Sequence, residues 1–380
     1  MKATATLQVK LEVTAEAAQS LKETSAAYVV ALRSTSQIAF ERKIFNSVAL
    51  HHATYRDVKA ATRLPANLVC SARCVVAEAY KRDHTKLHQW KSTAAMRYDA
   101  RTLTVRLEQE FATLSTLQGR VRVSLILADY HRQYLADGWQ IAPTATVSCR
   151  KGVWYLHLIA EKEIPDSDGK QVLGVDSGIV RIATTSTGRV FKGGRIKHIR
   201  QQRFKQRREL QAARHKTPNQ RKLLQRLAGK EKRTVEWLLW NVANQIVREA
   251  QRINASVIAV EDLTGIRSRI RVAKKQRLIQ HGWPFASLFQ KIAHVGSKVG
   301  IRVASVDARN TSKTCHQCGH CEARNRQSQA RFVCAACGHH TNADFNASLN
   351  IRDRFTFPES DTVTCRKNSP LAGRVKAVVF

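Results

Sequence analysis

Acidic residues are scarce in this chain of 380 residues. Only 29 Asp and Glu stand against 64 Lys and Arg, which leaves a formal charge of +35. Such an excess is unusual for an enzyme that handles small molecules, and it fits a protein that holds a long polyanion. We therefore expect nucleic acid as the partner, and no small-molecule substrate.

Long apolar runs are absent as well. No stretch approaches the roughly 18 residues of a membrane span, and the first residues lack the apolar segment of a signal peptide. Five of the nine cysteines are scattered, which argues for thiols rather than a disulfide framework. They are Cys70, Cys74, Cys149, Cys321 and Cys365. We expect no membrane contact and a soluble protein of a reducing, prokaryotic-type intracellular compartment, cytoplasmic and nucleoid-associated.

The first part of the chain mixes two periodicities. Residues 7–13 alternate apolar and polar side chains, which predicts a half-buried strand. Alternation returns between residues 98 and 163, and helical spacing fills the part between. The predicted helices cover 15–33, 37–53 and 65–82. We predict a small β-barrel that includes the first strand and carries the helical block as an insertion.

Several polar residues of the helical block recur at helical spacing, together with His51 and His52. They form either an ordinary solvated helix face or a contact surface for nucleic acid, and periodicity alone does not separate the two. The candidates for nucleic-acid contact are Tyr55, Lys59, Asn67, Ser71 and Arg73.

After a turn-rich linker at 165–169, the second part carries two strongly basic runs. Residues 192–233 are mostly helical and hold 16 Lys and Arg against Glu209 and Glu231, and residues 267–277 hold six cations and no acid. Because such charges repel one another unless anions are near, we expect nucleic-acid contact there. The candidates are Arg203, Lys205, Arg207, Arg208, Arg271 and Lys274.

Two tryptophans lie in the amphipathic helix predicted over 235–253. Trp237 and Trp240 are candidates for a base-stacking platform. Their position in mid-helix, among Leu and Val, favours burial in the core instead.

Four cysteines form two CxxC pairs separated by fifteen residues. Cys315, Cys318, Cys334 and Cys337 suit a tetrahedral structural zinc site, which four sulfurs close to catalysis. A glycine follows each pair and suits a tight turn. Alternative ligands are Cys321, His316, His320, His339 and His340.

Three carboxylates occupy positions where active sites form. Asp176 and Glu261 end predicted buried strands, and Asp344 opens the last predicted helix, seven residues after the final cysteine. If they converge, they require hard cations such as Mg²⁺ and suit a two-metal site for phosphodiester hydrolysis. Asp307 also ends a strand and is the rival for the third position.

These residues carry a family resemblance. Residues 172–179 (VLGVDSGI) and 257–263 (VIAVEDL) resemble the first two RuvC nuclease motifs. Residues 310–338 and 344–347 (DFNA) resemble the zinc ribbon and third motif of TnpB proteins, transposon-encoded RNA-guided DNA nucleases akin to type V CRISPR effectors. The chain departs from many relatives in having Asn342 where a further Asp often precedes the catalytic one, and in the extra Cys321.

The resemblance implies an α/β multi-domain protein. An RNase H-like (RuvC) nuclease domain with an inserted zinc ribbon would follow a wedge β-barrel that carries a helical recognition insert. The implied divisions are 1–14 (first wedge strand), 15–98 (recognition), 99–165 (wedge), 166–308 (RuvC), 309–341 (zinc ribbon), 342–354 (final RuvC helix) and 355–380 (flexible tail).

The same resemblance implies a Mg²⁺-dependent DNA endonuclease with one structural zinc and two catalytic magnesium ions. Its partners would be a guide RNA from the transposon end and a target DNA flanked by a short motif, with the protein monomeric in the RNA complex. Asp176, Glu261 and Asp344 would bind the magnesium ions. The alternatives are a DNA-cutting transposase, whose triad usually ends in Glu, and a nuclease-inactive RNA-guided regulator.

Overall fold

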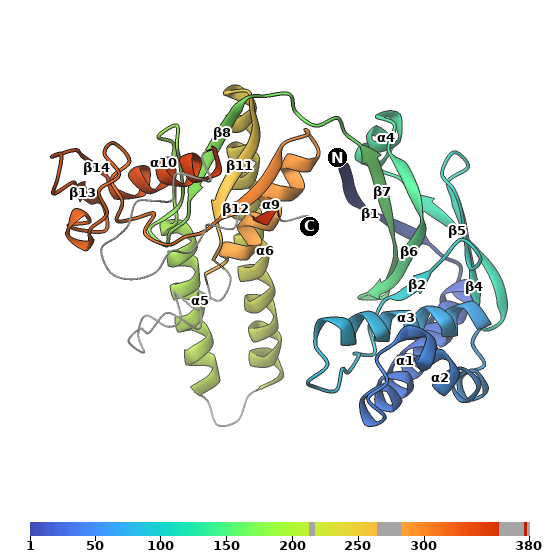
Figure 1. Cartoon of the computed structure of the whole chain (residues 1–380). Helices are drawn as coiled ribbons and strands as arrows, with labels where there is room; N and C mark the ends of the chain where they lie inside the picture. Colours follow the sequence, from blue (N-terminus) through green and yellow to red (C-terminus); the bar gives the residue numbers. More distant parts are fainter. Residues whose placement is uncertain (213–216, 264–282, 357–375, 378–380) are drawn as a thin grey trace. The chain divides into compact units, whose positions relative to one another are not determined.

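The computed structural model describes residues 1–212, 217–263, 283–356 and 376–377. It contains two compact units, one of Lys2–Glu163 and one made of Met1 and the chain from Ile164 onward (Figure 1). No helix in these ranges is both long and apolar enough to cross a membrane.

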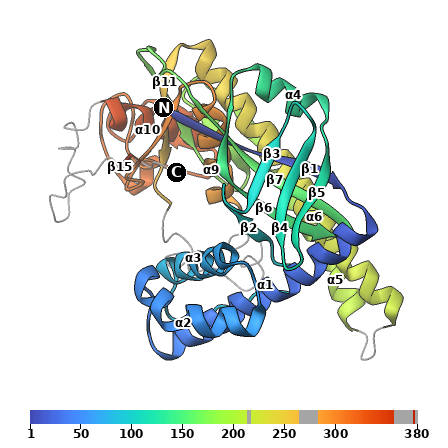
Figure 2. The same ribbon diagram turned by 90° about the vertical axis from the view of Figure 1, so that its right-hand side faces the viewer.

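The first unit is built on an antiparallel sheet in the order β2-β6-β7-β1-β5-β4-β3, which curls strongly in Figure 2. The strands are β1 (Lys2–Glu12), β2 (Met96–Tyr98), β3 (Leu103–Arg106), β4 (Phe111–Thr116), β5 (Gly119–Ile126), β6 (Gln140–Arg150) and β7 (Val153–Glu163). As predicted, β1 belongs to this sheet and pairs with β5 and β7. The sheet is nearly closed rather than a full barrel, since no pairing joins β2 to β3 within the described residues.

Three helices lie between β1 and β2: α1 (Ala15–Glu41), α2 (Ser47–Thr62) and α3 (Ala66–Arg82). The predicted break after Arg33 was wrong, because α1 continues through a buried polar turn. Its Ser36 hydroxyl donates to the carbonyl of His88 (2.8 Å) and lies 3.0 Å from the hydroxyl of Tyr80. The actual break follows Glu41, and the Asn46 side chain caps α2. The short helix α4 (Asp129–Ala136) had no clear signal in the sequence.

The second unit contains a six-stranded mixed sheet in the order β10-β9-β8-β11-β12-β15. Its strands are β8 (Gln171–Asp176), β9 (Arg181–Thr185), β10 (Val190–Lys192), β11 (Ala255–Glu261), β12 (Arg302–Val306) and β15 (Lys376–Ala377). Strands β8, β11 and β12 run parallel, and the other three pair antiparallel. The carboxyl ends of β8 and β11 therefore meet at one edge, which brings Asp176 and Glu261 onto neighbouring strands.

Helices cover both faces of this sheet, as Figure 1 shows. They are α5 (Gly194–Ala212), α6 (Pro218–Arg252), α9 (Phe285–Ser297) and α10 (Ala343–Thr356). Helices α6 and α9 pack with Leu173, Val175 and Ile258 in the main core. The other face holds Ala259 and Val306, packed against Ile351 of α10. Strand alternation places Asp176 and Glu261 on this α10 face.

The tryptophans of α6 were expected in the core, and that expectation was wrong. Trp237 is 57% exposed and Trp240 is 37% exposed. The buried side of α6 is formed by Val235, Leu239 and Ala243, which are spaced four residues apart. At 100° per residue, Trp237 lies almost opposite this stripe and Trp240 lies at its margin.

The end of the chain differs from the predicted flexible tail in one stretch. Residues Lys376 and Ala377 form β15 and pair antiparallel with β12, with Ala377 opposite Ala304. Residues 357–375 and 378–380 lie outside the described part.

A glycine in β8 allows α10 to lie very close to this strand. A Cβ atom on Gly174 would lie 2.1 Å from the carbonyl oxygen of Ser348 and 2.7 Å from the backbone nitrogen of Arg352. Both are backbone atoms of α10, so only glycine lets the helix lie this close to the strand.

Gly174→Ala should push α10 away from the sheet. We expect a loss of about 1–3 kcal/mol in unfolding free energy, as for other overpacked sites, and a larger loss of function because Asp344 moves with the helix. Thermal unfolding and nuclease assays check both. Gly194→Ala is the matched control, since its Cβ would meet nothing within 4 Å; equal behaviour of the two variants would contradict the prediction.

Candidate active site and metal centre

The three predicted carboxylates influence one another. Burial raises the pKa of Asp176 well above its usual value, and the negative charges of Glu261 and Asp344 raise it further. Burial also raises the pKa of Glu261, which is only 9% exposed, and that of Asp344. Glu261 and the first turn of α10 thus lie close enough for their carboxylates to repel the charge of Asp176.

Hydrogen bonds hold Glu261 in place and connect it to α10. The Thr311 hydroxyl donates to Glu261 Oε1 (2.5 Å). The side-chain amide of Asn350 donates to the carbonyl oxygens of Thr311 and Thr314 (both 2.8 Å). Because Thr311 and Asn350 are buried, the end of β11 and the middle of α10 are tied together across a segment that leads into the cysteine region.

Asn346, one turn before Asn350, makes the matching link to the first CxxC pair. Its Nδ2 donates to the Thr314 carbonyl (2.7 Å), and its Oδ1 accepts from the backbone nitrogen of His316 (3.0 Å). The sequence motif DFNA contains Asn346, and Asn350 follows it, but their partners lie thirty or more residues away. Only the fold reveals their role.

Two arginines approach Asp344, and sequence analysis missed both. Arg326 Nη2 lies 3.3 Å from Asp344 Oδ1, and Arg181 Nε lies 3.7 Å from Oδ2. The positive charge of Arg326 also offsets part of the rise in the pKa values of Asp176 and Glu261. Arg326 precedes β13 (Arg331–Val333), so the ribbon region contributes a cation to the carboxylate site.

Asn342, the departure from many TnpB relatives, caps α10. Its Oδ1 accepts from the backbone nitrogens of Asp344 (3.1 Å) and Phe345 (3.3 Å), and also from Arg181 Nη1. A side-chain oxygen at this position satisfies free N–H groups of the first helical turn. Asn342 therefore orients the turn that carries Asp344.

The rival carboxylate Asp307 has other partners. Its Oδ1 accepts from the backbone nitrogen of Arg309 (3.0 Å), as in an Asx turn, and its backbone carbonyl accepts from Arg354 (2.6 Å). Its charge raises the pKa of Glu261, so it lies near the site. The charges that raise the pKa of Asp176, however, belong to Glu261 and Asp344.

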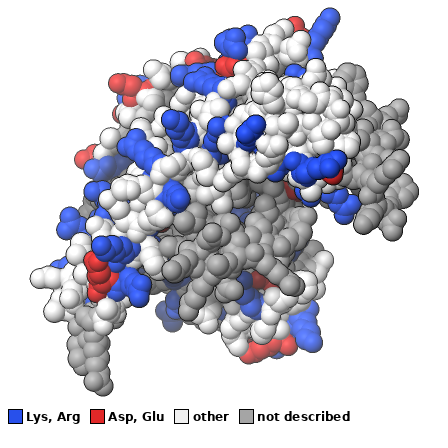
Figure 3. Space-filling view, turned by 90° about the vertical axis from the view of Figure 1, so that its left-hand side faces the viewer, with Lys and Arg blue, Asp and Glu red and all other residues white. Residues whose placement is uncertain are grey.

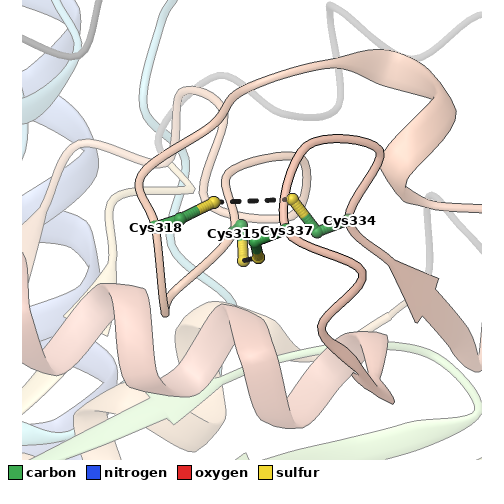
Figure 4. A group of neighbouring side chains, drawn as sticks. All are labelled: Cys315, Cys318, Cys334 and Cys337. Carbon is green, nitrogen blue, oxygen red and sulfur yellow. Dashed lines mark hydrogen bonds between the residues drawn. The ribbon is translucent and has the colours of Figure 1, made fainter.

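The four CxxC cysteines form a compact cluster (Figure 4). Their Sγ atoms all lie within 4.8 Å of one another, the only metal-binding group this tight among the described residues. Distances of 3.7 Å for Cys315–Cys337 and 3.5 Å for Cys318–Cys334 join the two pairs. The predicted turns are present, with positive φ at Gly319 (74°) and Gly338 (73°). The cluster fits a metal ion held by four sulfurs.

A buried asparagine links the two halves of this cluster. Asn325 is fully buried; its Nδ2 donates to the carbonyls of Lys313 (2.9 Å) and His320 (3.0 Å), and its Oδ1 accepts from the nitrogen of Ala335 (2.9 Å). The fully buried ring of Phe332 packs with Cys315 and Cys334.

The alternative ligands are engaged elsewhere or lie outside the cluster. His316 Nδ1 lies 2.9 Å from Asp353, and His320 Nε2 lies 3.2 Å from Glu322. Neither His339 nor His340 joins the four sulfurs. Cys321, for which a thiol was expected, is disulfide-bonded, which removes it from the possible ligands. Cys70, Cys74 and Cys149 are thiols as predicted.

The structure separates the nucleic-acid candidates of the helical block. Tyr55 stacks on His51 (4.8 Å between ring centroids), and Lys59 lies 5.9 Å from the Tyr55 ring. Ser71 instead donates to the Arg97 carbonyl (2.7 Å), and Arg73 donates to the Ser47 carbonyl (3.2 Å). Ser71 thus ties α3 to β2, and Arg73 ties α3 to α2. Lys59 is exposed, and the other four candidates are half-buried.

The basic candidates of α5 also differ from one another. Arg207 pairs with Glu231 of α6, and Arg203 donates to Gln206 (2.7 Å). Lys205 and Arg208 are exposed. Arg271 and Lys274 lie outside the described residues. On the face drawn in Figure 3, Lys and Arg are spread widely and Asp and Glu are few, as the overall composition requires.

Two family models match the chain. Residues 156–267 match a family described as a probable transposase, and residues 285–351 match one described as the Cas12f1-like TNB domain. The matched regions contain the three carboxylates and the four clustered cysteines.

Curated proteins are similar over about half of the chain. The CRISPR-associated endodeoxyribonuclease Cas12f1 of Sulfoacidibacillus thermotolerans is 32% identical over 219 residues, which are 53% of this chain and 50% of that protein. The putative RNA-guided DNA endonuclease InsQ of Escherichia coli (strain K12) is 26% identical over 234 residues, 56% of each chain. This chain thus spans about half the length of these relatives.

A solved structure of Cas12f1 in complex with sgRNA and target DNA shares the fold. The TM-score is 0.64 at 18% identity, and the match covers 89% of this chain and 83% of that one. Other similar proteins are described as TnpB-like. The resemblance inferred from the motifs is therefore confirmed: this chain is similar in sequence to TnpB-like and Cas12f1 proteins, and it shares the α/β fold of Cas12f1.

Proposed function

We propose that this chain is an RNA-guided DNA endonuclease whose active site is formed by Asp176, Glu261 and Asp344. The observation that carries the proposal is that the charges of Glu261 and Asp344 raise the pKa of Asp176, and that burial raises the pKa of all three acids. Acids in such an arrangement release their protons fully only when cations are present. Among similar proteins, Cas12f1 is a CRISPR-associated endodeoxyribonuclease and InsQ is a putative RNA-guided DNA endonuclease.

The residues present suit magnesium ions, for which carboxylate oxygens are preferred ligands. Bound to Asp176, Glu261 and Asp344, a pair of such ions would supply an activated water and stabilise the leaving oxygen of a phosphodiester. The chain's own contribution is positional. Thr311 orients Glu261, and Asn342 caps the turn that carries Asp344.

The cysteine cluster suits a structural zinc ion, since four sulfurs leave no open position. The ribbon it stabilises is joined to α10 through Asn346 and supplies Arg326 to Asp344. We infer that the zinc site holds the ribbon in the shape that keeps these two contacts.

The folds of the two units suit the nuclease role and the nucleic-acid-binding role of such an endonuclease. Counting its first five strands in chain order, the second unit's sheet is arranged 3-2-1-4-5, and β9 runs opposite to the other four, as in an RNase H-like (RuvC) domain. The nearly closed sheet and helical insert of the first unit suit a wedge and recognition region. Guide RNA and target DNA would be held by backbone charge while base pairing selects the sequence.

Purification and reprogramming test this function. The protein expressed with its flanking DNA should retain an RNA that RNase removes, and the loaded protein should cut a DNA target only when the guide segment matches. Changing the guide segment should redirect the cut. Retention of no RNA, with binding confined to specific duplex ends, would favour the transposase alternative; RNA retention without cleavage under any divalent cation would favour the regulator.

A further inference from the structure

The second unit exposes two large aromatic side chains on one side of α6. Trp237 and Trp240 are 57% and 37% exposed, although the same helix buries Leu239 completely. Asn241 and Asn244 follow them on the helix, and their side-chain amides donate to the backbone carbonyls of Trp237 and Trp240 (2.9 and 2.8 Å). The two indoles are therefore followed on the helix by polar asparagine residues rather than by further apolar side chains.

Cations from the neighbouring helices accompany both indoles. The Arg195 guanidinium of α5 lies 5.7 Å from the Trp237 ring centroid, and Lys291 Nζ of α9 lies 5.1 Å from that of Trp240. Lys291 is held by Glu236 (2.5 Å) and Ser287 (2.9 Å). Such cation–π contacts fix the indoles. The exposed Arg195 adds positive charge beside Trp237, whereas the charge of the buried Lys291 is balanced by Glu236.

The indoles lie at the same end of the sheet as the carboxylates. Helix α6 ends at Arg252, and β11 begins three residues later and packs against it in the opposite direction. Trp240 is twelve residues, or roughly 18 Å, before the end of α6. Glu261 is six residues, or roughly 20 Å, after the start of β11. Both therefore stand at about the same level along the strand direction, with α6 on one face of the sheet and the two strand-end carboxylates on the α10 face.

We propose that Trp237 and Trp240 form a stacking platform for unpaired bases of the DNA strand that enters the carboxylate site. Exposed aromatic rings beside cations are the means by which proteins hold single strands without sequence preference. A polyanionic strand fits better than a protein partner because the chain carries a net charge of +35. The choice of DNA rests on the proposed function, since the strand to be cut must reach this edge of the sheet.

Binding of single-stranded DNA by the full-length, RNA-loaded protein tests the platform. A fluorescein-labelled oligothymidylate of twenty nucleotides should bind the Trp237→Ala/Trp240→Ala double variant at least about tenfold more weakly, because stacking stabilises each base by about 1–3 kcal/mol. The slope of affinity against salt should not change, since no phosphate contact is lost. Blunt duplex DNA should bind the variant and the wild type equally.

Two further variants keep the test interpretable. Trp237→Phe/Trp240→Phe retains two aromatic rings and should retain most of the affinity, whereas a purely structural role of the indoles would make it as defective as the Ala variant. Leu223→Ala removes another exposed apolar side chain of α6 (42% exposed) and should bind like the wild type. Equal RNA retention and thermal stability establish that each variant is folded.

Three results would overturn the proposal. They are wild-type affinity of the double Ala variant for the oligonucleotide, an equal loss for duplex and single strand, and a change from dimer to monomer on substitution, which would make the indoles an interface between copies of the chain. Failure of the platform is distinguishable from failure of the proposed function. In the first case the wild type still cuts guided targets, and in the second it does not.

Discussion

Asp176→Asn should abolish guided DNA cleavage while leaving RNA retention and target binding near the wild-type level. The substitution preserves the shape of the side chain and removes one of three charges that the site uses to hold cations. Removing a single electrostatic contributor to a transition state typically costs about 10²–10³ in rate, and a lost metal ligand should cost at least as much. Cleavage kinetics and gel-shift assays on the same RNA-loaded preparation check both parts. Lost RNA binding would show that Asp176 is structural.

Asp307→Asn and Asp344→Asn decide which acid completes the site. The amide oxygen at position 307 could still accept from the Arg309 backbone nitrogen, so we expect near-normal cleavage. Asp344→Asn keeps the helix cap, which Asn342 provides, and should be as inactive as Asp176→Asn. The reverse result, with Asp307→Asn inactive and Asp344→Asn active, would give the third position to Asp307.

Stability should change in the opposite sense to activity. The folded-state pKa of Asp176 is raised by burial and by its acidic neighbours, so its ionisation in the absence of metal disfavours the folded state. This penalty is absent at pH values below the unfolded-state pKa and grows as pH rises through the folded-state pKa. At neutral pH in EDTA, Asp176→Asn should therefore raise Tm; a gain of about 1 kcal/mol corresponds to roughly 2–4 °C for a unit of this size.

Magnesium should reverse the order of the two Tm values, so that the wild type becomes more stable than Asp176→Asn. Cations that bind only the folded state stabilise it more as their concentration rises above the Kd, so Mg²⁺ should raise the Tm of the wild type and change that of Asp176→Asn little. A decrease in Tm of the variant in EDTA would contradict the view that the three acids repel one another in the folded protein.

Cys315→Ser should remove the zinc ion and unfold the ribbon. Cys315 is 1% exposed, and its backbone nitrogen bonds the carbonyl of His320 (2.9 Å), so it is central to the first turn. Structural zinc sites supply about 10–16 kcal/mol of binding free energy, which is also folding free energy. We expect about one zinc per wild-type chain by mass spectrometry of metals and almost none in the variant.

Unfolding of the ribbon should also lower the activity of the carboxylate site. Unfolding the ribbon breaks the Asn346 bond to His316 and withdraws Arg326 from Asp344, so cleavage should fall even though the sheet of the second unit remains. Cys149→Ser, a thiol in the first unit, is the matched control and should keep both zinc and activity. Unchanged zinc content in Cys315→Ser would refute the ligand set.

Local patterns were sufficient for several features. The CxxC spacing and the glycines after each pair predicted the sulfur cluster and its turns, because a CxxC turn positions both ligands within four residues. Alternation along β1 predicted its strand, and buried strands that end in acids predicted the edge where Asp176 and Glu261 meet. In each case the interacting groups lie near one another in sequence, or strand direction alone brings them together.

Other features depended on contacts between distant segments. Arg181 and Arg326 meet at Asp344 from a strand and from the ribbon, and no spacing relates them. Asn346 and Asn350 stabilise the site through carbonyls more than thirty residues away. The break after Arg33 was misplaced because hydroxyl groups that favour a helix end in isolation find buried partners in the folded unit.

The sequence by itself therefore determined the cysteine cluster, the three candidate carboxylates and the demand for a polyanionic partner. These follow from residue type, short spacing and net charge. The tertiary structure decided that the charges of Glu261 and Asp344 act on Asp176, that two arginines lie beside Asp344, and that Trp237 and Trp240 face outward. The physical reason is that burial and charge–charge interactions depend on which surfaces of helices and strands pack together, and helical composition alone does not specify which side of α6 meets the sheet.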